Sequence, residues 1–170
     1  MRRLVAAALA ALALAAAAAA DEEKVPLDKA PKAVLDAAKK RFPKAEVVGV
    51  SKETEKDKTV YEVELKENGK TIDVTLTPDG AVTAIEQEID AKELPKAVAE
   101  ALDKKYPKAT YNSVEVVYAV TDGKESLDFY EVELTTADKK VFEVKLAADG
   151  KIKEEEEKKP EKKDEKKDEA

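Results

Sequence analysis

The pentapeptide YEVEL occurs twice in this chain, at 61–65 and unchanged at 130–134. A longer match precedes it: PKAVLDAAKKRFPKA (31–45) and PKAVAEALDKKYPKA (95–109) agree at nine of fifteen positions, at an offset of 64. A stretch that recurs in this way indicates a tandem duplication of one structural unit. The fold must therefore be one that a unit of about 65 residues can form and that two copies can build together.

An Asp-Gly dipeptide also recurs, as Asp79–Gly80 and Asp149–Gly150, but here the offset has grown to 70. The growth indicates five extra residues in the second copy around 120–128, and one more in the hairpin that follows YEVEL. We therefore divide the chain into a first repeat at 25–90 and a second repeat at 91–155.

Each repeat opens with a predicted helix. Apolar residues recur there at i, i+3 and i+4, the spacing that forms one apolar helix face. They are Ala30, Ala33, Val34, Ala37, Ala38 and Phe42 in the first repeat, and Leu94, Ala97, Val98, Ala101, Leu102 and Tyr106 in the second. We expect Asp28 to cap the first helix, with Pro31 in its first turn. The RFP and KYP sequences end the helices, because the residue before a proline is disfavoured in helical geometry.

Strands follow each helix. Tyr61, Val63 and Leu65 alternate with Glu62 and Glu64, which is typical of a strand with one buried face. Similar strands are expected at 45–50, 72–76, 82–89, 130–134, 142–146 and 151–155. Hairpin turns such as Asn68–Gly69 make the connections short, so the sheet is antiparallel. The predicted class is α+β, with an α-β-β-β-β unit in which the helix covers one face of the meander.

Two arrangements of the repeats are open. In the first, they join edge to edge into one continuous curved eight-stranded sheet; in the second, they form separate units. The segment between them, 88–93, is short and contains neither glycine nor proline. This favours close packing of the two repeats.

The two ends of the chain differ from its middle. Residues 1–20 combine Arg2 and Arg3 with an Ala/Leu run and small residues, as in a secretory signal peptide cleaved near Ala20. A membrane anchor is the alternative, although the apolar run is short and weakly apolar. The stretch 156–170 is almost entirely Lys, Glu and Asp and is expected to be disordered. These ends predict a periplasmic or secreted protein that has no membrane segment after cleavage.

Charge and composition exclude several function classes. The formal charge is −7, and −9 once the two arginines of the leader are removed, which argues against nucleic-acid binding. The chain has no His and no Cys, so thiol nucleophiles, His-based triads and imidazole or thiolate metal sites are excluded. We predict no cofactor and no metal. The turns at Asp79 and Asp149 account for these residues better than calcium ligation does.

Carboxylates are the enzymatic option that remains. Glu62 and Glu64, like Glu131 and Glu133, lie two residues apart on a strand, roughly 6.6 Å, within the range of paired-acid glycosidases. A general acid, however, needs a raised pKa, and these residues are expected on a solvated sheet face. We therefore expect no enzymatic activity.

A partner-binding surface is a further candidate. Because Tyr130 points inward by analogy with Tyr61, Phe129 should point outward, near Tyr118 and the 120–128 insertion. An exposed aromatic side chain of this kind can anchor a partner protein, with Glu131 and Glu133 beside it on the same strand. The alternative is that Phe129 packs against the other repeat.

The repeated pattern P-x-A-V, F/Y-P-x-A, Y-E-V-E-L and D-G resembles the PepSY-like, or beta-lactamase-inhibitor-like, family of exported bacterial domains, in two tandem copies. The resemblance covers residues 25–155. It implies tandem α/β repeats whose sheets form a concave face, and a non-catalytic role in gripping or restraining an enzyme. The repeated residues are mainly packing and turn positions, so they do not identify a target.

Three hypotheses follow. The first is an exported, monomeric, non-catalytic module that binds or inhibits another envelope protein, such as a peptidase, through the open sheet face. The second is a carboxylate-based hydrolase that uses a Glu pair. The third is a passive acidic binder of cations or basic peptides.

Overall fold

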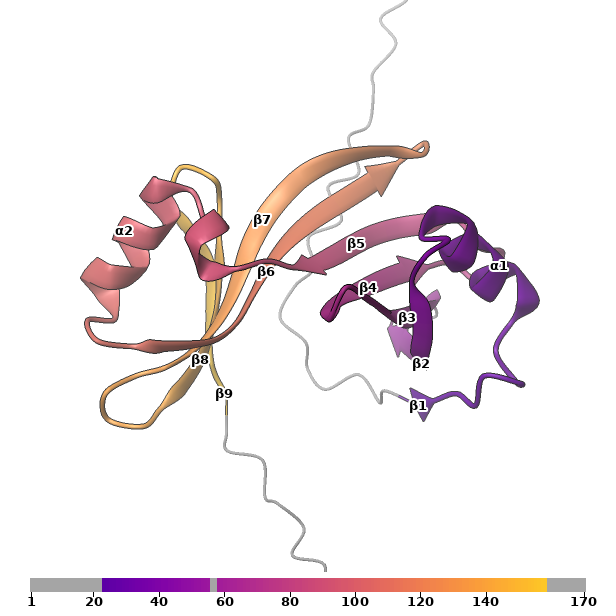
Figure 1. The fold of residues 1–170 in the computed structure, drawn as a ribbon, viewed down its shortest axis with the longest axis horizontal. Helices are drawn as coiled ribbons and strands as arrows, with labels where there is room; N and C mark the ends of the chain where they lie inside the picture. Colours follow the sequence, from indigo (N-terminus) through magenta and orange to yellow (C-terminus); the bar gives the residue numbers. More distant parts are fainter. Residues whose placement is uncertain (1–22, 56–57, 159–170) are drawn as a thin grey trace, which may run out of the picture.

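In the computed structural model, residues 23–55 and 58–158 are described, and they form one nine-stranded antiparallel sheet with two helices (Figure 1). The elements in chain order are β1 Glu23–Lys24, α1 Lys32–Arg41, β2 Glu46–Glu55, β3 Lys58–Glu67, β4 Lys70–Leu76, β5 Val82–Glu88, the short 3-10 helix η1 Ala91–Glu93, α2 Lys96–Lys105, β6 Thr110–Thr121, β7 Lys124–Thr135, β8 Val141–Leu146 and β9 Ile152–Lys158. The expected signal peptide, 1–20, lies outside the described residues.

The two helices occupy equivalent places in the repeats. Each begins directly after a proline, Pro31 or Pro95, and each ends at the aromatic residue before the next proline, Phe42 or Tyr106. The expectation that Asp28 caps α1 is wrong, because Pro31 is the N-cap residue and no side chain caps this helix. The backbone of 26–30 forms its own turn, with the Ala30 N–H donating to the Pro26 carbonyl, so α1 begins later than Asp28 could reach.

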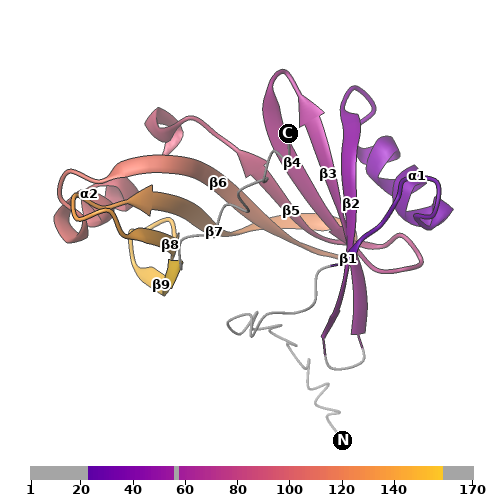
Figure 2. The same cartoon turned by 90° about the horizontal axis from the view of Figure 1, so that it is seen from below.

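The sheet is continuous across the boundary between the repeats. Strands pair in sequence order from β1 to β9, and β5 pairs with β6 through Gln87↔Val116 and Glu88↔Glu115. This confirms the joined arrangement and adds one strand, β1, to the eight expected. Figure 2 shows the strong twist of the sheet, with α1 and α2 near its opposite ends.

Each helix covers its own apolar core. Val34 and Ala38 of α1 are buried against β2 to β5, and Val98 and Leu102 of α2 are buried against β6 to β8. Cross-strand partners share a face of the sheet, and Gln87, on the Ile85 side of β5, pairs with Val116. Both helices therefore lie on the same face, and the opposite face, which we call the open face, carries no helix of the described residues.

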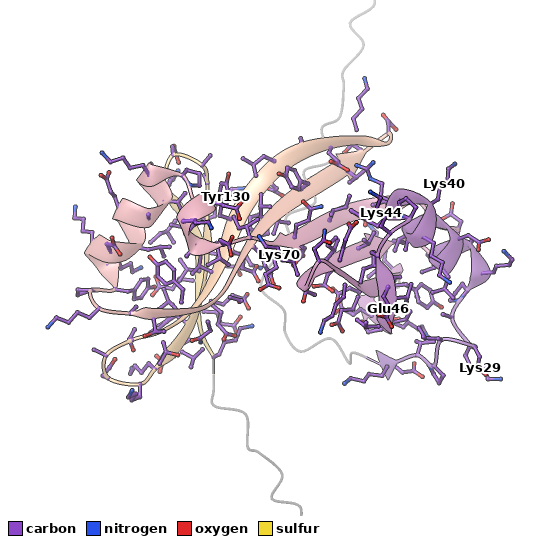
Figure 3. The ribbon with its side chains drawn as sticks, viewed as in Figure 1. Lys29, Lys40, Lys44, Glu46, Lys70 and Tyr130 are labelled. Carbon is purple, nitrogen blue, oxygen red and sulfur yellow. The ribbon has the colours of Figure 1, made fainter. Side chains whose placement is uncertain are left out.

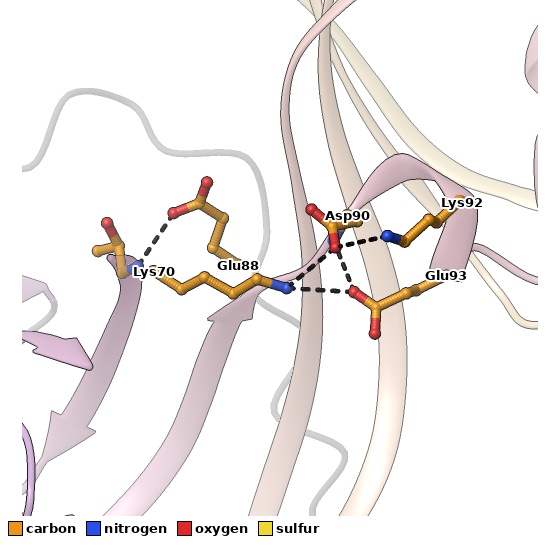
Figure 4. A network of polar contacts seen from close by, with 6 residues as sticks. Lys70, Glu88, Asp90, Lys92 and Glu93 are labelled. Carbon is orange, nitrogen blue, oxygen red and sulfur yellow. Dashed lines mark hydrogen bonds and ion pairs between the residues drawn. The ribbon is translucent and has the colours of Figure 1, made fainter. Parts of the chain in front are cut away.

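A polar network ties the first repeat to the connection between the repeats (Figure 4). Lys70 Nζ lies 3.6 Å from Asp90 Oδ2 and 3.2 Å from Glu93 Oε2, and the Asp90 N–H donates to Glu93 Oε2 at 2.8 Å. The Thr71 N–H donates to Glu88 Oε2 at 3.0 Å. These contacts link the start of β4 to the end of β5 and to η1.

The charged end of the chain is more ordered than its composition suggests. β9 continues to Lys158, three residues into the stretch that was expected to be disordered. Lys158 Nζ lies 2.6 Å from Glu143 Oε2, and Lys145 Nζ lies 3.6 Å from Glu154 Oε2. Pairing with β8 therefore orders this segment, and charges of both signs occupy the edge strand, where they discourage pairing with another chain. The rest of the expected tail, 159–170, lies outside the described residues.

The 120–128 insertion lengthens the β6–β7 hairpin, which reaches toward the first repeat (Figure 1). Val120 packs against the apolar core of the first repeat, and Glu125 forms an ion pair with Arg41 at the end of α1. The insertion therefore contacts the other repeat. It extends the interface between the two units beyond the β5–β6 pairing.

We expect Val120→Ser to lower the free energy of unfolding by about 1–2 kcal/mol, because it removes apolar contacts with the first core. Leu127→Ser is the matched control in the same hairpin, since Leu127 is 41% exposed. It should change stability by less than about 0.5 kcal/mol. Urea unfolding monitored by circular dichroism measures both. Equal losses in the two variants would show that the hairpin does not brace the first repeat.

Candidate functional site

Carboxylates dominate the open face. Alternation along each strand directs their side chains away from the helices, as expected for a sheet with one covered face. They are Glu62 and Glu64 on β3, Asp73 on β4, Glu86 and Glu88 on β5, Glu115 on β6, Glu131 and Glu133 on β7, Glu143 on β8, and Glu154 and Glu156 on β9. Several lysines, among them Lys29, Lys40 and Lys44, lie instead around α1 (Figure 3).

Three of these carboxylates converge at the centre of the open face. Glu86, Glu115 and Glu131 each place an oxygen within 4.8 Å of the others, and we call them the central carboxylates. Burial, followed by repulsion from Glu131, raises the pKa of Glu86 to about 8 and that of Glu115 to about 7. Both groups therefore take up protons near neutral pH.

The pKa values of two neighbouring carboxyls, Asp73 and Glu131, are raised for similar reasons. Burial and then the charge of Glu64 raise the pKa of Asp73 to about 6. Burial and Glu143 also raise the pKa of Glu131, although Lys145 opposes the shift. The expectation of a freely solvated face is therefore wrong at its centre. Carboxylates that occupy adjacent strands in register shield one another from water and repel one another.

Cations balance one end of the face. Lys145 Nζ lies 3.5 Å from Glu131 Oε2 and 3.8 Å from Glu143 Oε1, close to β9. In the part of the chain that the structure describes, no lysine or arginine forms an ion pair with Asp73, Glu86 or Glu115. These three carboxylates at the centre of the face therefore have no cationic partner within that part of the chain, and their negative charge grows as the pH rises.

The central carboxylates have the chemistry to hold a hard cation, because Ca²⁺ and Mg²⁺ prefer carboxylate oxygens. They supply oxygen ligands from three strands. The turn residues considered for calcium have other roles. Asp79 accepts a hydrogen bond from the Thr77 hydroxyl at 2.5 Å, and Asp149 accepts one from the Lys151 N–H at 3.0 Å.

The structure separates the four expected partner-binding residues. Phe129, Glu131 and Glu133 alternate on β7 and share the open face. Tyr118 pairs with Ile85, a buried residue of the first core, and therefore lies on the helix-covered face. The nearby β-bulge falls on β7, where Asp128 has no partner on β6. Alternation on β6 is unbroken from Val114 to Tyr118, so Tyr118 lies on the same side as the buried Val114 and Val116.

Phe129 packs within its own repeat. Lys145 Nζ lies 5.5 Å from the ring centre, Lys153 Nζ lies 5.4 Å from it, and Val117 is its cross-strand partner. Lys153 also forms an ion pair with Asp128 at 2.5 Å. The ring is therefore partly covered by two ammonium groups and is not a bare apolar anchor.

The Glu pairs considered for hydrolysis have structural contacts. Glu133 accepts a hydrogen bond from Asn112 Nδ2 at 2.9 Å, and Glu131 pairs with Lys145. The groups with clearly raised pKa values, Glu86 and Glu115, belong to other strands. They were missed because a strand-by-strand reading does not show which side chains on β5 and β6 become neighbours. Glu86 and Glu115 could have been identified by aligning the outward-facing glutamates of strands that were expected to be neighbours.

A cavity of about 320 Å³ lies at the β1–β2 end of the open face. It is lined by Lys24, Val25, Pro26, Leu27, Val48, Gly49, Val50, Ser51, Glu62 and Glu64. Leu27 and Val48 are 45% and 40% exposed, which is unusual for large apolar side chains in this protein. Ser51 is only 7% exposed, and its hydroxyl has no hydrogen-bond partner among the described residues.

Two family models match the chain. The model described as "Peptidase propeptide and YPEB domain" matches residues 29–92, and the model described as "Putative beta-lactamase-inhibitor-like, PepSY-like" matches residues 72–154. The two matches together cover the ordered sheet except for its ends. No curated protein sequence matches the chain.

Solved structures share this fold. A "putative periplasmic" protein from Bacteroides eggerthii aligns with a TM-score of 0.61 at 19% identity, covering 75% of this chain and 88% of that one. A DUF2874 family protein from Bacteroides uniformis gives 0.59 at 21% identity, covering 75% and 89%. A BLIP-like protein from Bacteroides fragilis gives 0.53 at 19% identity, covering 74% and 84%.

The family matches cover nearly the same stretch of the chain as the two repeats and most of the sheet. In the described residues, no helix is long and apolar enough to cross a membrane. The expected resemblance is confirmed by two family models that between them span both repeats. Residues 29–154 of the chain are therefore similar to the PepSY and the PepSY-like, beta-lactamase-inhibitor-like domain families.

Proposed function

We propose that this protein is an exported, non-catalytic module that binds another envelope protein through the open face of its sheet. The observation that carries the proposal is a nine-stranded sheet whose two helices lie on one face, leaving the other face uncovered by any described helix. The matched families, which are named for propeptides and inhibitors, support a binding role. An enzyme such as a peptidase is the partner class that we propose first.

Export is part of the proposal. It is supported by the basic and apolar leader at 1–20 and by similar structures that are described as periplasmic. Removal of the leader near Ala20 would release a chain that begins at Asp21. We expect this form to be monomeric, because β9 and its charges discourage edge-to-edge association.

Affinity capture tests the proposal. Mature protein, residues 21–170, is immobilised and exposed to envelope extract of the source organism, beside the double variant Phe129→Ala, Glu131→Lys. We expect a specific protein to bind the mature form and to bind the variant at least about tenfold more weakly, a loss of about 1.4 kcal/mol. The bound protein is then purified and its affinity measured directly.

The control carries changes of the same kind on the helix-covered side. Leu127→Ala, Glu100→Lys alters one exposed residue of the hairpin and one of α2, and it leaves the open face intact. It should bind the partner as the mature form does. A partner that both variants lose, or that neither loses, would contradict binding through the open face.

A further inference from the structure

Several carboxylates near the centre of the open face have no cationic partner among the described residues. Asp73, Glu86 and Glu115 form no ion pair with a described lysine or arginine, whereas Lys145 and Lys158 balance the β8–β9 end. A partner that carries positive charge there would be favoured, because it offsets the repulsion among these carboxylates once they are ionised. Charge complementarity therefore indicates a basic partner surface.

The lining of the cavity at the β1–β2 end indicates which cationic side chain the partner would carry. Val25, Leu27 and Val48 give it aliphatic walls, while Glu62 and Glu64 add two carboxylates and Lys24 adds one ammonium group. Ser51 also belongs to the lining, but its hydroxyl is buried and has no hydrogen-bond partner among the described residues. An aliphatic chain that ends in an ammonium group matches both parts of this lining, and among protein side chains that is lysine.

Gly49 keeps the cavity open. A Cβ atom at this position would lie 3.2 Å from Glu64 Oε2, so a larger side chain there would fill part of the cavity and shift the Glu64 carboxylate slightly. No positive φ angle requires glycine here, so a larger residue is compatible with the backbone. The cavity can therefore be filled by substitution without changing the charge of the face.

We propose that the open face binds an extended lysine-rich segment of the partner, with one lysine side chain in the β1–β2 cavity and further lysines over the carboxylates of β4 to β7. This inference rests on the proposed function, and it adds the chemistry of the partner. Strands lie about 4.8 Å apart, so Glu64 on β3 and Glu131 on β7 are separated by roughly 19 Å. Four lysines at alternate positions of an extended segment span about 20 Å and match this distance.

Binding should strengthen as the pH rises from 6 to 8.5. Glu86 and Glu115, with pKa values of about 8 and 7, lose protons in this range, whereas lysines stay charged. The charged groups that face them are Glu62 and Glu64 of β3, Asp73 of β4, Glu88 of β5, Glu131 and Glu133 of β7, Glu143 and Lys145 of β8, and Glu154 and Lys158 of β9. The two lysines remain charged throughout the same range.

The test uses the mature protein and the acetyl-KAKAKAK-amide peptide, with isothermal titration calorimetry at low salt. Glu86→Gln, Glu115→Gln and, separately, Gly49→Val should each weaken binding, the first about tenfold and the second about fivefold. The charge-matched control is Asp36→Asn, Glu100→Gln, which removes two carboxylates from α1 and α2. It should change the affinity less than about twofold. The peptide with acetylated lysines should not bind.

Equal weakening by the open-face and helix variants would mean that only net charge attracts the peptide, and it would overturn the inference. Affinity that is unchanged by Gly49→Val, or that does not rise with pH, would overturn it as well. If the partner captured from the envelope needs the open face but the lysine peptide does not bind, the inference is wrong and the proposed function stands. If the peptide binds as described and no envelope protein depends on the open face, the proposed function fails.

Discussion

Replacing Gly150 by alanine is expected to lower the free energy of unfolding by about 3–4 kcal/mol, or to prevent folding of the second repeat. Gly150 has a φ of +84°, a region that alanine adopts at a cost. A Cβ atom there would also lie 2.3 Å from the Ala97 carbonyl oxygen of α2. The turn before β9 is therefore packed against the backbone of α2. A Cβ atom at position 150 could be accommodated only if α2 moved.

The matched control is Gly123→Ala, in the β6–β7 turn. Its φ is +73°, but a Cβ atom would meet nothing within 4 Å. This variant has only the cost of placing alanine at a positive φ angle, about 1 kcal/mol. Urea unfolding of both variants, followed by circular dichroism, separates the two contributions. Losses of similar size would show that the close approach of Gly150 to α2 does not constrain the fold.

Replacing Glu86 by glutamine is expected to raise the free energy of unfolding by about 2 kcal/mol at pH 8.5 and to change it little near pH 4.5. Burial and three neighbouring glutamates, with Asp73, raise the pKa of Glu86 to about 8 from the ordinary 4.5. Glutamine has the shape of the protonated side chain and never acquires its charge. The expected gain is smaller than the whole shift implies, because neighbouring carboxyls share the proton and water reaches this half-buried face.

The direction with pH follows from the raised pKa of the folded state. Between about pH 4.5 and 8, unfolding of the native protein releases the proton of Glu86, so the free energy of unfolding falls as the pH rises. Asp73 and Glu115 contribute in the same direction over narrower ranges, up to about 6 and 7. The protein should therefore be more stable near pH 5 than at pH 8.5.

Urea unfolding at several pH values between 4.5 and 8.5 measures this trend. Glu100→Gln, on the exposed side of α2, is the control and should give a difference from the native protein that does not vary with pH. If the Glu86→Gln protein and the native protein keep a constant difference over this range, the centre of the open face is fully hydrated.

Gly80 and Gly150 show what the repeat could indicate before the structure was known. The recurring Asp-Gly dipeptide predicts a turn in each copy, and both turns form. The same two turns press against their helices, near Ala33 in one repeat and Ala97 in the other. That contact joins residues far apart in the chain, so it could not be derived from the local pattern.

The open face illustrates a second limit. Alternation correctly directed Phe129, Glu131 and Glu133 to one side of β7. It did not show that Glu86 and Glu115, from different repeats, would approach Glu131. Their distances depend on the register between β5 and β6, and no hairpin turn connects these strands. The pKa values of the central carboxylates therefore follow from the joining of the repeats.

The sequence by itself determined the duplicated unit, the helix and strands of each copy and the sign of the open face, because periodicity, turn residues and charge are local properties. The tertiary structure decided that the sheets merge, that both helices lie on one side and that the 120–128 hairpin braces the first repeat. It also ordered the chain up to Lys158 by pairing with β8. Each of these outcomes depends on contacts between distant segments, and their free energies arise only when the chain is folded.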